Sequence, residues 1–138
     1  MQSCYHDDAR FTDPVFQNLT AMETKAMWHM LTAAAVDLKV LFGNVQAGEH
    51  IGTCQWQAWY TFSRTGRKVH NRIDASFGFK DGKIIRHVDQ FDLWRWSRMA
   101  LGLPGVVLGW TPIIPNQIRK TARKGLDKFI EVHPEYKR

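Results

Sequence analysis

Two residues that can move protons, His87 and Asp89, are spaced two apart in the run IIRHVDQFD. Residues two apart on a β-strand point to the same face of the sheet, so the two side chains should share one environment. A carboxylate beside an imidazole can orient the ring and raise its basicity, which suits general acid/base catalysis. We therefore predict that His87 and Asp89 are catalytic. The alternative is a buried pair that only fixes the register of the sheet.

Two further segments place single polar residues among apolar ones. Tyr60 lies on the apolar face of TCQWQAWYTFS, and Asn71 lies on the apolar face of VHNRIDASFGF. Apolar walls with a few convergent polar groups are typical of a small-molecule site, so Tyr60 and Asn71 are predicted to bind a ligand. Tyr60 would otherwise be an ordinary core residue. The apolar wall of this site is predicted to contain Trp56, Ile73, Phe77, Phe91 and Met27.

Asp13 precedes a proline in the N-terminal run YHDDARFTDPVF. Asp-Pro steps are common in turns, where the aspartate accepts hydrogen bonds from nearby backbone amides. A metal site formed by His87, Asp89 and Asp13 is a further alternative, but these residues have no specific ligand spacing. The sequence therefore predicts neither a metal nor a cofactor.

The elements that must position these residues follow from hydrophobic periodicity. The run LTAMETKAMWHMLTAAA predicts a helix, and Thr20 and Glu23 have the spacing of a capping box at its start. Alternation with period two then predicts strands in DLKVLFGNV, TCQWQAWYTFS, VHNRIDASFGF and IIRHVDQFD, with hairpin turns at RTGR and KDGK. One short strand, a helix and this meander predict an α+β domain with an antiparallel sheet.

The C-terminal third carries the excess positive charge. Residues 1–93 contain ten Lys/Arg and ten Asp/Glu, whereas residues 94–138 contain nine and three, which accounts for the net charge of +6. Helices are expected near 93–101 and 115–130. The second, basic and amphipathic, could contact an anionic membrane surface, although a solvated charged face on a packing helix is commoner. Nucleic-acid binding is not expected of the balanced main body.

Cysteine usage and the N-terminal residues favour a cytoplasmic location. Cys4 and Cys54 have no metal-ligand spacing and are expected to be reduced thiols, with a single disulfide as the alternative. The chain does not begin with the basic and apolar pattern of a signal peptide. The longest uncharged run, residues 99–118, is interrupted by three prolines and several glycines, so it is not expected to span a bilayer.

The order and spacing of several runs resemble the nuclear transport factor two-like superfamily, in particular its SnoaL-like and ketosteroid isomerase-like members from bacteria. These runs are YHDDARFTDPVF, AMWHML, YTFSRTGR, ASFGFKDGKIIRHVDQFD and LWRWSRMALGLPG. The resemblance implies a curved antiparallel sheet wrapped by helices into a cone, a cystatin-like α+β barrel. It implies one domain over 1–138, with a family core at 4–92 and a C-terminal helical extension at 93–138. By the same resemblance, YHDDARFTDPVF follows the second helix of the family, the first helix is missing, and the extension could fill its place.

The resemblance also bears on the site residues. Asp13 matches the aspartate that acts as the general base in ketosteroid isomerases. The oxyanion hole of those enzymes does not match, because the tyrosine of the first helix is absent and Ala75 stands where a protonated aspartate is expected. Steroid isomerisation is therefore not expected. Asp89 resembles, by position, the acid/base aspartate of SnoaL-like cyclases, and Asp13 is then expected to assist it.

Two classes of function remain at this point. The first is an acid/base enzyme of isomerase, cyclase or hydrolase/hydratase type that acts on a hydrophobic small molecule. The second is a non-catalytic ligand-binding or dimerisation domain. Trp59, Gln57, Arg72 and Asp74 alternate to the outer face of the predicted sheet, so a homodimer through this face is expected in either case.

Overall fold

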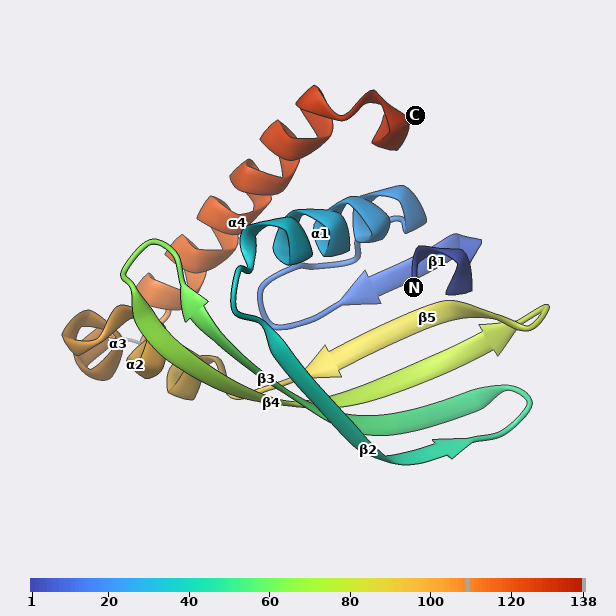
Figure 1. The fold of residues 1–138 in the computed structure, drawn as a ribbon, viewed down its shortest axis with the longest axis horizontal. Helices are drawn as coiled ribbons and strands as arrows, with labels where there is room; N and C mark the ends of the chain where they lie inside the picture. The colour runs from blue at the N-terminus through green and yellow to red at the C-terminus, as the bar shows by residue number, and fades with distance from the viewer. Residues whose placement is uncertain (109, 138) are drawn as a thin grey trace.

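A computed structural model describes residues 1–108 and 110–137. Its centre is one five-stranded sheet with the order β1-β5-β4-β3-β2 (Figure 1). The strands are β1 Tyr5–Thr12, β2 Lys39–Ala47, β3 Ile51–Phe62, β4 Arg67–Lys80 and β5 Lys83–Gln90. The α-helices are α1 Ala21–Ala34, α2 Leu93–Leu101, α3 Leu103–Leu108 and α4 Ile113–Val132, and the short 3-10 helices are η1 Gln2–Cys4 and η2 Pro134–Tyr136. The α+β class and the predicted elements are confirmed.

Local rules set the ends of several elements. Thr20 caps α1 by accepting a hydrogen bond from the Glu23 amide, and the Glu23 side chain accepts one from the Thr20 amide, so the predicted capping box is present. The turn between β4 and β5 places Asp81 and Gly82 at φ 54° and 72°. Two residues in this left-handed region match the right-handed twist of a tight hairpin, as KDGK predicted.

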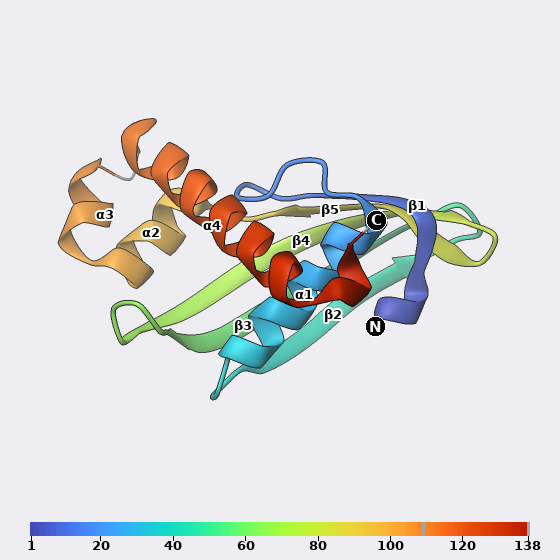
Figure 2. The same cartoon turned by 90° about the horizontal axis from the view of Figure 1, so that it is seen from above.

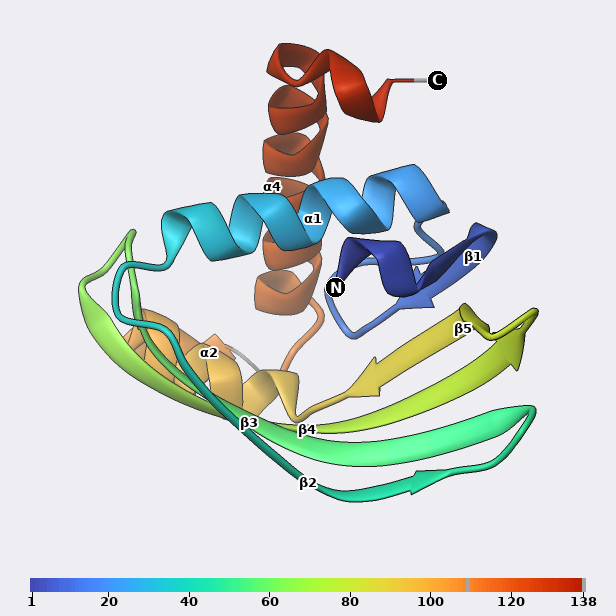
Figure 3. The ribbon, with the colours of Figure 1, turned by 45° about the vertical axis from the view of Figure 1, so that its right-hand side comes forward.

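The curved, cone-like α+β fold is confirmed, but the sheet is mixed and not closed, so the expectation of an antiparallel sheet does not hold for β1. Strands β2 to β5 are antiparallel neighbours because short turns join them, whereas β1 pairs with β5 in the parallel direction. No hairpin turn links β1 to β5, so local chemistry does not set their relative direction. The strands curve strongly without closing, with β1 and β2 at the two edges (Figure 3).

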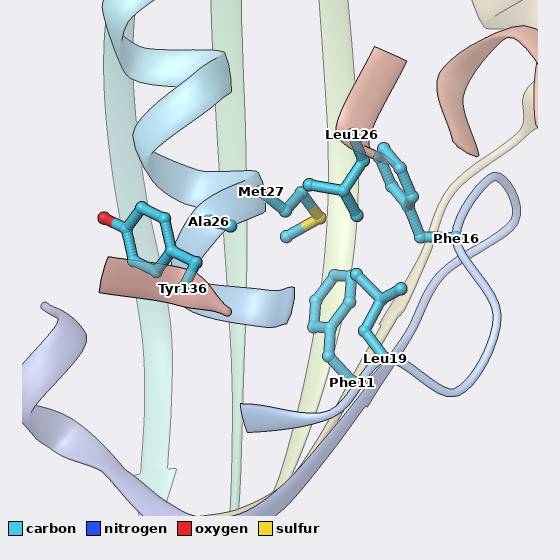
Figure 4. Close-up of a cluster of buried hydrophobic side chains, with 7 residues drawn as sticks. All are labelled: Phe11, Phe16, Leu19, Ala26, Met27, Leu126 and Tyr136. Atoms are coloured by element: carbon cyan, nitrogen blue, oxygen red, sulfur yellow. The ribbon is translucent and has the colours of Figure 1, made fainter. Parts of the chain in front are cut away.

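Helix α1 lies across the concave side of the sheet, and α4 crosses α1 on the side away from the strands (Figures 2 and 3). The main core lies between these helices and the start of the chain (Figure 4). It consists of Phe11, Phe16, Leu19, Ala26, Met27, Leu126 and Tyr136. The C-terminal extension is thus packed into the domain through one face of α4. Burial of these apolar side chains is the principal source of stability at this contact.

The charged face of α4 is partly engaged with the rest of the domain. Arg123 forms ion pairs with Glu23 of α1 and with Asp127, and Arg119 donates a hydrogen bond to the Pro14 carbonyl. Cys4 and Cys54 are both free thiols. Among the described residues, no helix combines the length and apolarity needed to cross a membrane.

Candidate active site on the concave face of the sheet

A chain of four polar side chains runs from α1 to β5. Trp28 Nε1 donates to the Tyr5 hydroxyl at 2.9 Å, the hydroxyl lies 2.8 Å from His87 Nδ1, and His87 Nε2 lies 2.7 Å from Asp89 Oδ1. His87 and Asp89 are only 5% and 3% exposed. The structure therefore brings together the two residues that the strand pattern paired.

The indole at one end of this chain sets the direction of its hydrogen bonds. An indole N–H can only donate, so the Tyr5 oxygen accepts from Trp28 and its hydroxyl proton is available to His87 Nδ1. The remaining ring proton then lies on Nε2 and is donated to Asp89. This tautomer uses every donor in the chain and holds the imidazole in one orientation. Burial raises the pKa of Tyr5, so its hydroxyl keeps its proton.

Aromatic rings enclose His87 and explain its depth in the fold. Strand β1 places Phe11 beside His87 in the parallel register, with the Phe11 ring edge-on at 4.9 Å. Strand β4 places Phe77 opposite His87, with the two ring centroids 4.6 Å apart. An imidazole in such a setting must be hydrogen-bonded at both nitrogens, because an unpaired buried polar group costs about 1–3 kcal/mol.

Asp13 forms the turn contacts that its position before a proline predicted, and its carboxyl is also perturbed by burial. Its Oδ1 accepts hydrogen bonds from the amides of Val15 and Phe16 at 2.7 and 2.6 Å, as in an aspartate turn. Burial raises the pKa of this half-buried carboxyl to about 6; the amides oppose the shift, and the charges of Asp89 and His87 act on it in opposite senses. Asp13 is therefore close enough for the charges of His87 and Asp89 to influence its pKa.

The three residues do not form a metal site. Within residues 1–108 and 110–137, His87, Asp89 and Asp13 do not bring three ligand atoms within 4.8 Å of one another. The metal alternative for this group is therefore not supported by the geometry.

Asp89 faces a surface formed by the neighbouring strands. It lies opposite Ala75 of β4, which lies opposite Cys54 of β3, so the three side chains form a row across the concave face. Ala75, which lies between the thiol and the carboxylate in this row, is buried. Burial, reinforced by the negative charge of Asp89, raises the pKa of Cys54. Trp56 and Ile73 form the next row and provide part of the predicted apolar wall.

The second Asp89 oxygen is not tied up by the hydrogen-bond chain, although Asp89 as a whole is only 3% exposed. Oδ2 accepts no hydrogen bond from the described residues, and the only fully buried side-chain polar atom without a partner among them is Arg98 Nε. The concave face is also open along its β2 edge. Val40 and Phe42 share this face with Trp56, yet they are 45% and 76% exposed. The surface thus runs from a nearly closed end at Asp89 to an open apolar edge at β2.

Two predicted ligand-binding residues lie further along the sheet. Asn71 is paired with Ala58, four residues along β4 from Ala75, which corresponds to about 13 Å. Tyr60 lies beyond it, and its hydroxyl accepts a hydrogen bond from Trp96 Nε1 at 2.7 Å. Burial raises the pKa of Tyr60, and its hydroxyl serves to attach α2 to the sheet. The structure therefore separates Tyr60 and Asn71 from the His87–Asp89 end of the face.

The remaining wall residues differ in their surroundings. Met27 is fully buried and packs against Leu126 and Phe11 in the core between α1 and α4 (Figure 4). Phe77 is half-buried beside His87, and Phe91 is half-buried just after the end of β5. Met27 thus serves packing in this structure, whereas Phe77 borders the candidate site.

The two described cavities lie elsewhere. A groove of about 590 Å³ is lined by Arg67, Lys68, Arg95, Arg98 and Met99, where the β3–β4 turn meets α2. A second groove of about 450 Å³ lies between α1 and α4. Neither of these two grooves is lined by His87 or Asp89.

Three residues of this site were not among the predicted site residues. Tyr5 and Trp28 complete the hydrogen-bond chain, and Cys54 lies across from Asp89. The sequence pattern could have indicated Cys54, because this residue lies on the apolar face of its strand, as Tyr60 does. Tyr5 is 82 residues from His87 in the chain, and no local pattern relates the two positions.

Comparisons with known proteins place the fold. No curated protein matches the sequence significantly. Among solved structures, a SnoaL-like candidate polyketide cyclase from Jannaschia sp. CCS1 has a TM-score of 0.64 at 16% identity, covering 75% of this chain and 76% of that chain. An LEH-like epoxide hydrolase of M. tuberculosis has a TM-score of 0.57 at 17% identity, covering 78% and 80%. TerC, crystallised with polyporic acid, has a TM-score of 0.59 at 16% identity, covering 70% and 80%.

These neighbours agree in the fold while their described activities differ. The sequence itself matches the model of the SnoaL-like domain over residues 1–87, which is more than half of the chain. The chain therefore belongs to the SnoaL-like domain family.

Proposed function

We propose that this protein is an acid/base enzyme that acts on a hydrophobic small molecule held on the concave face of the sheet. The observation that carries the proposal is the Trp28–Tyr5–His87–Asp89 hydrogen-bond chain, which ends at a carboxylate whose second oxygen has no hydrogen-bond partner among the described residues. The apolar rows beside it offer contact area for the substrate, and the exposed β2 edge offers a route to it.

In the proposed reaction, Asp89 Oδ2 takes a proton from the substrate while Oδ1 stays hydrogen-bonded to His87. The ordered imidazole stabilises the carboxylate in the orientation needed for transfer. Asp13, whose pKa is raised to about 6, carries a proton in part of the population near neutral pH and supplies or accepts the second one. Two carboxyl groups in different environments can divide the acid and base roles in this way.

Support for the substrate class comes from the apolar lining and the neighbours. Trp28 and Trp56 are in edge contact, with ring centroids 6.2 Å apart, and give an aromatic border to the concave face. Candidate polyketide cyclases, an epoxide hydrolase and a protein crystallised with polyporic acid share this fold. A planar, largely apolar molecule with an acidic C–H or an epoxide fits both observations. Isomerisation, cyclisation and hydrolysis all remain within this proposal.

A non-catalytic role is the second candidate, and a specific observation favours it. His87 and Asp89 are nearly buried, and neither described groove reaches them. A fully satisfied His–Asp pair can serve only to fix sheet register, and such networks exist without catalysis. In that case the apolar concave face would bind a ligand without transforming it.

Ligand binding is tested first, and turnover second. Polyporic acid is titrated into the ¹⁵N-labelled protein, and shifts are expected at Cys54, Trp56 and Ile73 but not in α4. Shifts confined to other regions would contradict the proposed binding face. A panel of epoxides and linear polyketide-like ketones is then screened for turnover. Asp89→Asn should lower turnover of any substrate found by 100-fold or more; an unchanged rate would assign the non-catalytic role.

We also propose that the outer face of the sheet forms a homodimer. Trp59 and His70 stack there with centroids 4.4 Å apart, and Leu41 on the same face is 52% exposed. Trp59→Arg should convert a dimer to a monomer in analytical ultracentrifugation, with Lys124→Arg on α4 as a control. If the wild-type protein stays monomeric over a 100-fold range of protein concentration, the proposal is contradicted.

A further inference from the structure

A second group of histidines and a carboxylate lies on the other side of α1. His29 belongs to α1, His133 follows the end of α4, and Glu135 belongs to η2. One nitrogen from each imidazole and one Glu135 carboxylate oxygen all lie within 4.8 Å of one another. The histidines are half-buried and Glu135 is exposed, so solvent can reach the group. Only the fold unites these residues, because more than a hundred positions separate His29 from the other two.

Hydrogen bonds orient both imidazole rings through Nδ1. His133 Nδ1 lies 2.8 Å from the Phe129 carbonyl, which can only accept, so the ring proton is on Nδ1 and Nε2 keeps its lone pair. His29 Nδ1 lies 3.0 Å from the Tyr136 hydroxyl, which also accepts a hydrogen bond from Gln2 Nε2. None of the hydrogen bonds found in the described part of the chain uses Nε2 of either ring. Metal-binding histidines typically have this arrangement, with the second nitrogen bonded to a carbonyl or another polar group.

Ring packing holds the two histidines in place. The Phe129 ring stacks on His133 at 3.8 Å and meets His29 edge-on at 5.0 Å. The imidazoles themselves are 5.2 Å apart at their centroids. Side chains that are already ordered lose little conformational freedom when they bind, which favours affinity. Glu135, being exposed, is free to close on an ion from the solvent side.

We propose that His29, His133 and Glu135 bind a divalent transition-metal ion, with Zn²⁺ as the best match. Two imidazoles and one carboxylate are a common donor set for Zn²⁺, with a water molecule as the fourth ligand. Bonds of about 2.0–2.2 Å in a tetrahedron place ligand atoms about 3.4 Å apart. The present separations need to shorten by at most about 1.4 Å, which requires rotation of the Glu135 side chain and a small adjustment of the two imidazole rings.

The ion would connect α1 to the C-terminal end of α4. Tyr136, which lies between Glu135 and the core, already packs in the cluster that contains Met27 and Leu126. A ligand that binds only the folded state raises the unfolding midpoint in proportion to the logarithm of its concentration. Zn²⁺ is therefore expected to stabilise the contact between the family core and the C-terminal extension. This inference is independent of the proposed acid/base function.

The test uses the full chain, stripped with EDTA and titrated with ZnCl₂ by calorimetry and with CoCl₂ by visible absorption. We expect one equivalent of Zn²⁺ with micromolar or tighter affinity, and a rise of about 5 °C in the unfolding midpoint at saturating metal. The cobalt protein should show the intense visible bands of four-coordinate Co²⁺.

Three variants locate the ion. Glu135→Gln keeps the size of an exposed side chain and should weaken binding about tenfold, and His133→Gln about 100-fold. His50→Gln, in the turn between β2 and β3, is the matched control and should bind as the wild type does. Absence of saturable binding, or equal affinity in Glu135→Gln, His133→Gln and the control, would overturn the site.

Discussion

The molecule contains two groups in which tyrosine, histidine and a carboxylate meet, one on each side of α1. In the first, Tyr5 and Asp89 occupy both nitrogens of a buried His87. In the second, Tyr136 and a backbone carbonyl occupy only the Nδ1 atoms of His29 and His133, near an exposed Glu135. Similar side chains are thus suited to different chemistry in the two groups. A buried group with paired nitrogens can transfer protons, whereas a surface group whose Nε2 atoms make no hydrogen bond can bind an ion from solution, with release of the His29 ring proton.

The largest expected effect comes from breaking the buried pair. His87→Leu leaves the Asp89 carboxylate without its partner in a nearly closed site, so the free energy of unfolding in urea should fall by about 3–5 kcal/mol. The surface pair of His6 and Asp81 is the control, because Asp81 is largely exposed. His6→Leu should cost about 1 kcal/mol or less.

The double variant His87→Leu/Asp89→Leu sharpens this comparison. Replacing both partners by apolar groups removes the uncompensated charge, so the double variant should be more stable than His87→Leu alone. If the double variant is as unstable as the sum of the two single variants, the pair does not act as a unit.

The next largest effect is the pH dependence of folding stability that Asp13 causes. The folded protein holds this proton up to about pH 6, whereas an ordinary aspartate releases it near 3.8. The folded state therefore binds more protons between these values, and stability should fall by up to about 3 kcal/mol as pH rises through this window.

The variant Asp13→Asn, which replaces the carboxyl by an amide of the same size, tests this prediction. Asp13→Asn keeps an oxygen for the Val15 and Phe16 amides but cannot ionise, so the fall between pH 4 and pH 7 should become smaller. Urea unfolding at several pH values measures the difference between the two proteins. An identical pH profile for Asp13→Asn would show that this carboxyl has an ordinary pKa.

Local sequence signals predicted the elements well, and the reason is physical. The capping box at Thr20, the DG turn at Asp81 and the period-two strands depend on residues close in the chain. The pairing of His87 with Asp89 was predictable on the same ground, since two residues on one strand face need no tertiary information.

The parts that sequence reasoning missed depend on distant contacts. Nothing near Tyr5 indicates that β1 will pair in parallel with β5, and this pairing is what brings its hydroxyl to His87. The same holds for His29 and His133, which meet only because α4 folds back across α1. Tyr60 shows the reverse case, because its strand face was predicted correctly while its partner, Trp96, lies on a helix beyond the sheet.

The third prediction removes the hydroxyl of Tyr5. Tyr5→Phe leaves Trp28 Nε1 and His87 Nδ1 without their shared partner in a buried setting, so the free energy of unfolding should fall by about 1–3 kcal/mol. Chemical shifts of the His87 ring nitrogens in ¹⁵N spectra should change as well, because the tautomer loses its constraint. An unchanged ring spectrum would contradict the proposed direction of the hydrogen bonds.

The smallest effect on stability is expected when the tyrosine hydroxyl of the His29–His133–Glu135 group is removed. Tyr136→Phe removes a hydroxyl that contacts Gln2 and His29, but water can replace it because both partners lie near the surface. The metal-free protein should lose about 0.5–1 kcal/mol in urea unfolding. Affinity for Zn²⁺ should fall at the same time, because His29 loses the hydrogen bond that orients its ring. If Tyr136→Phe destabilises the protein as much as Tyr5→Phe does, the two groups do not differ in solvent access, and burial is not what separates them.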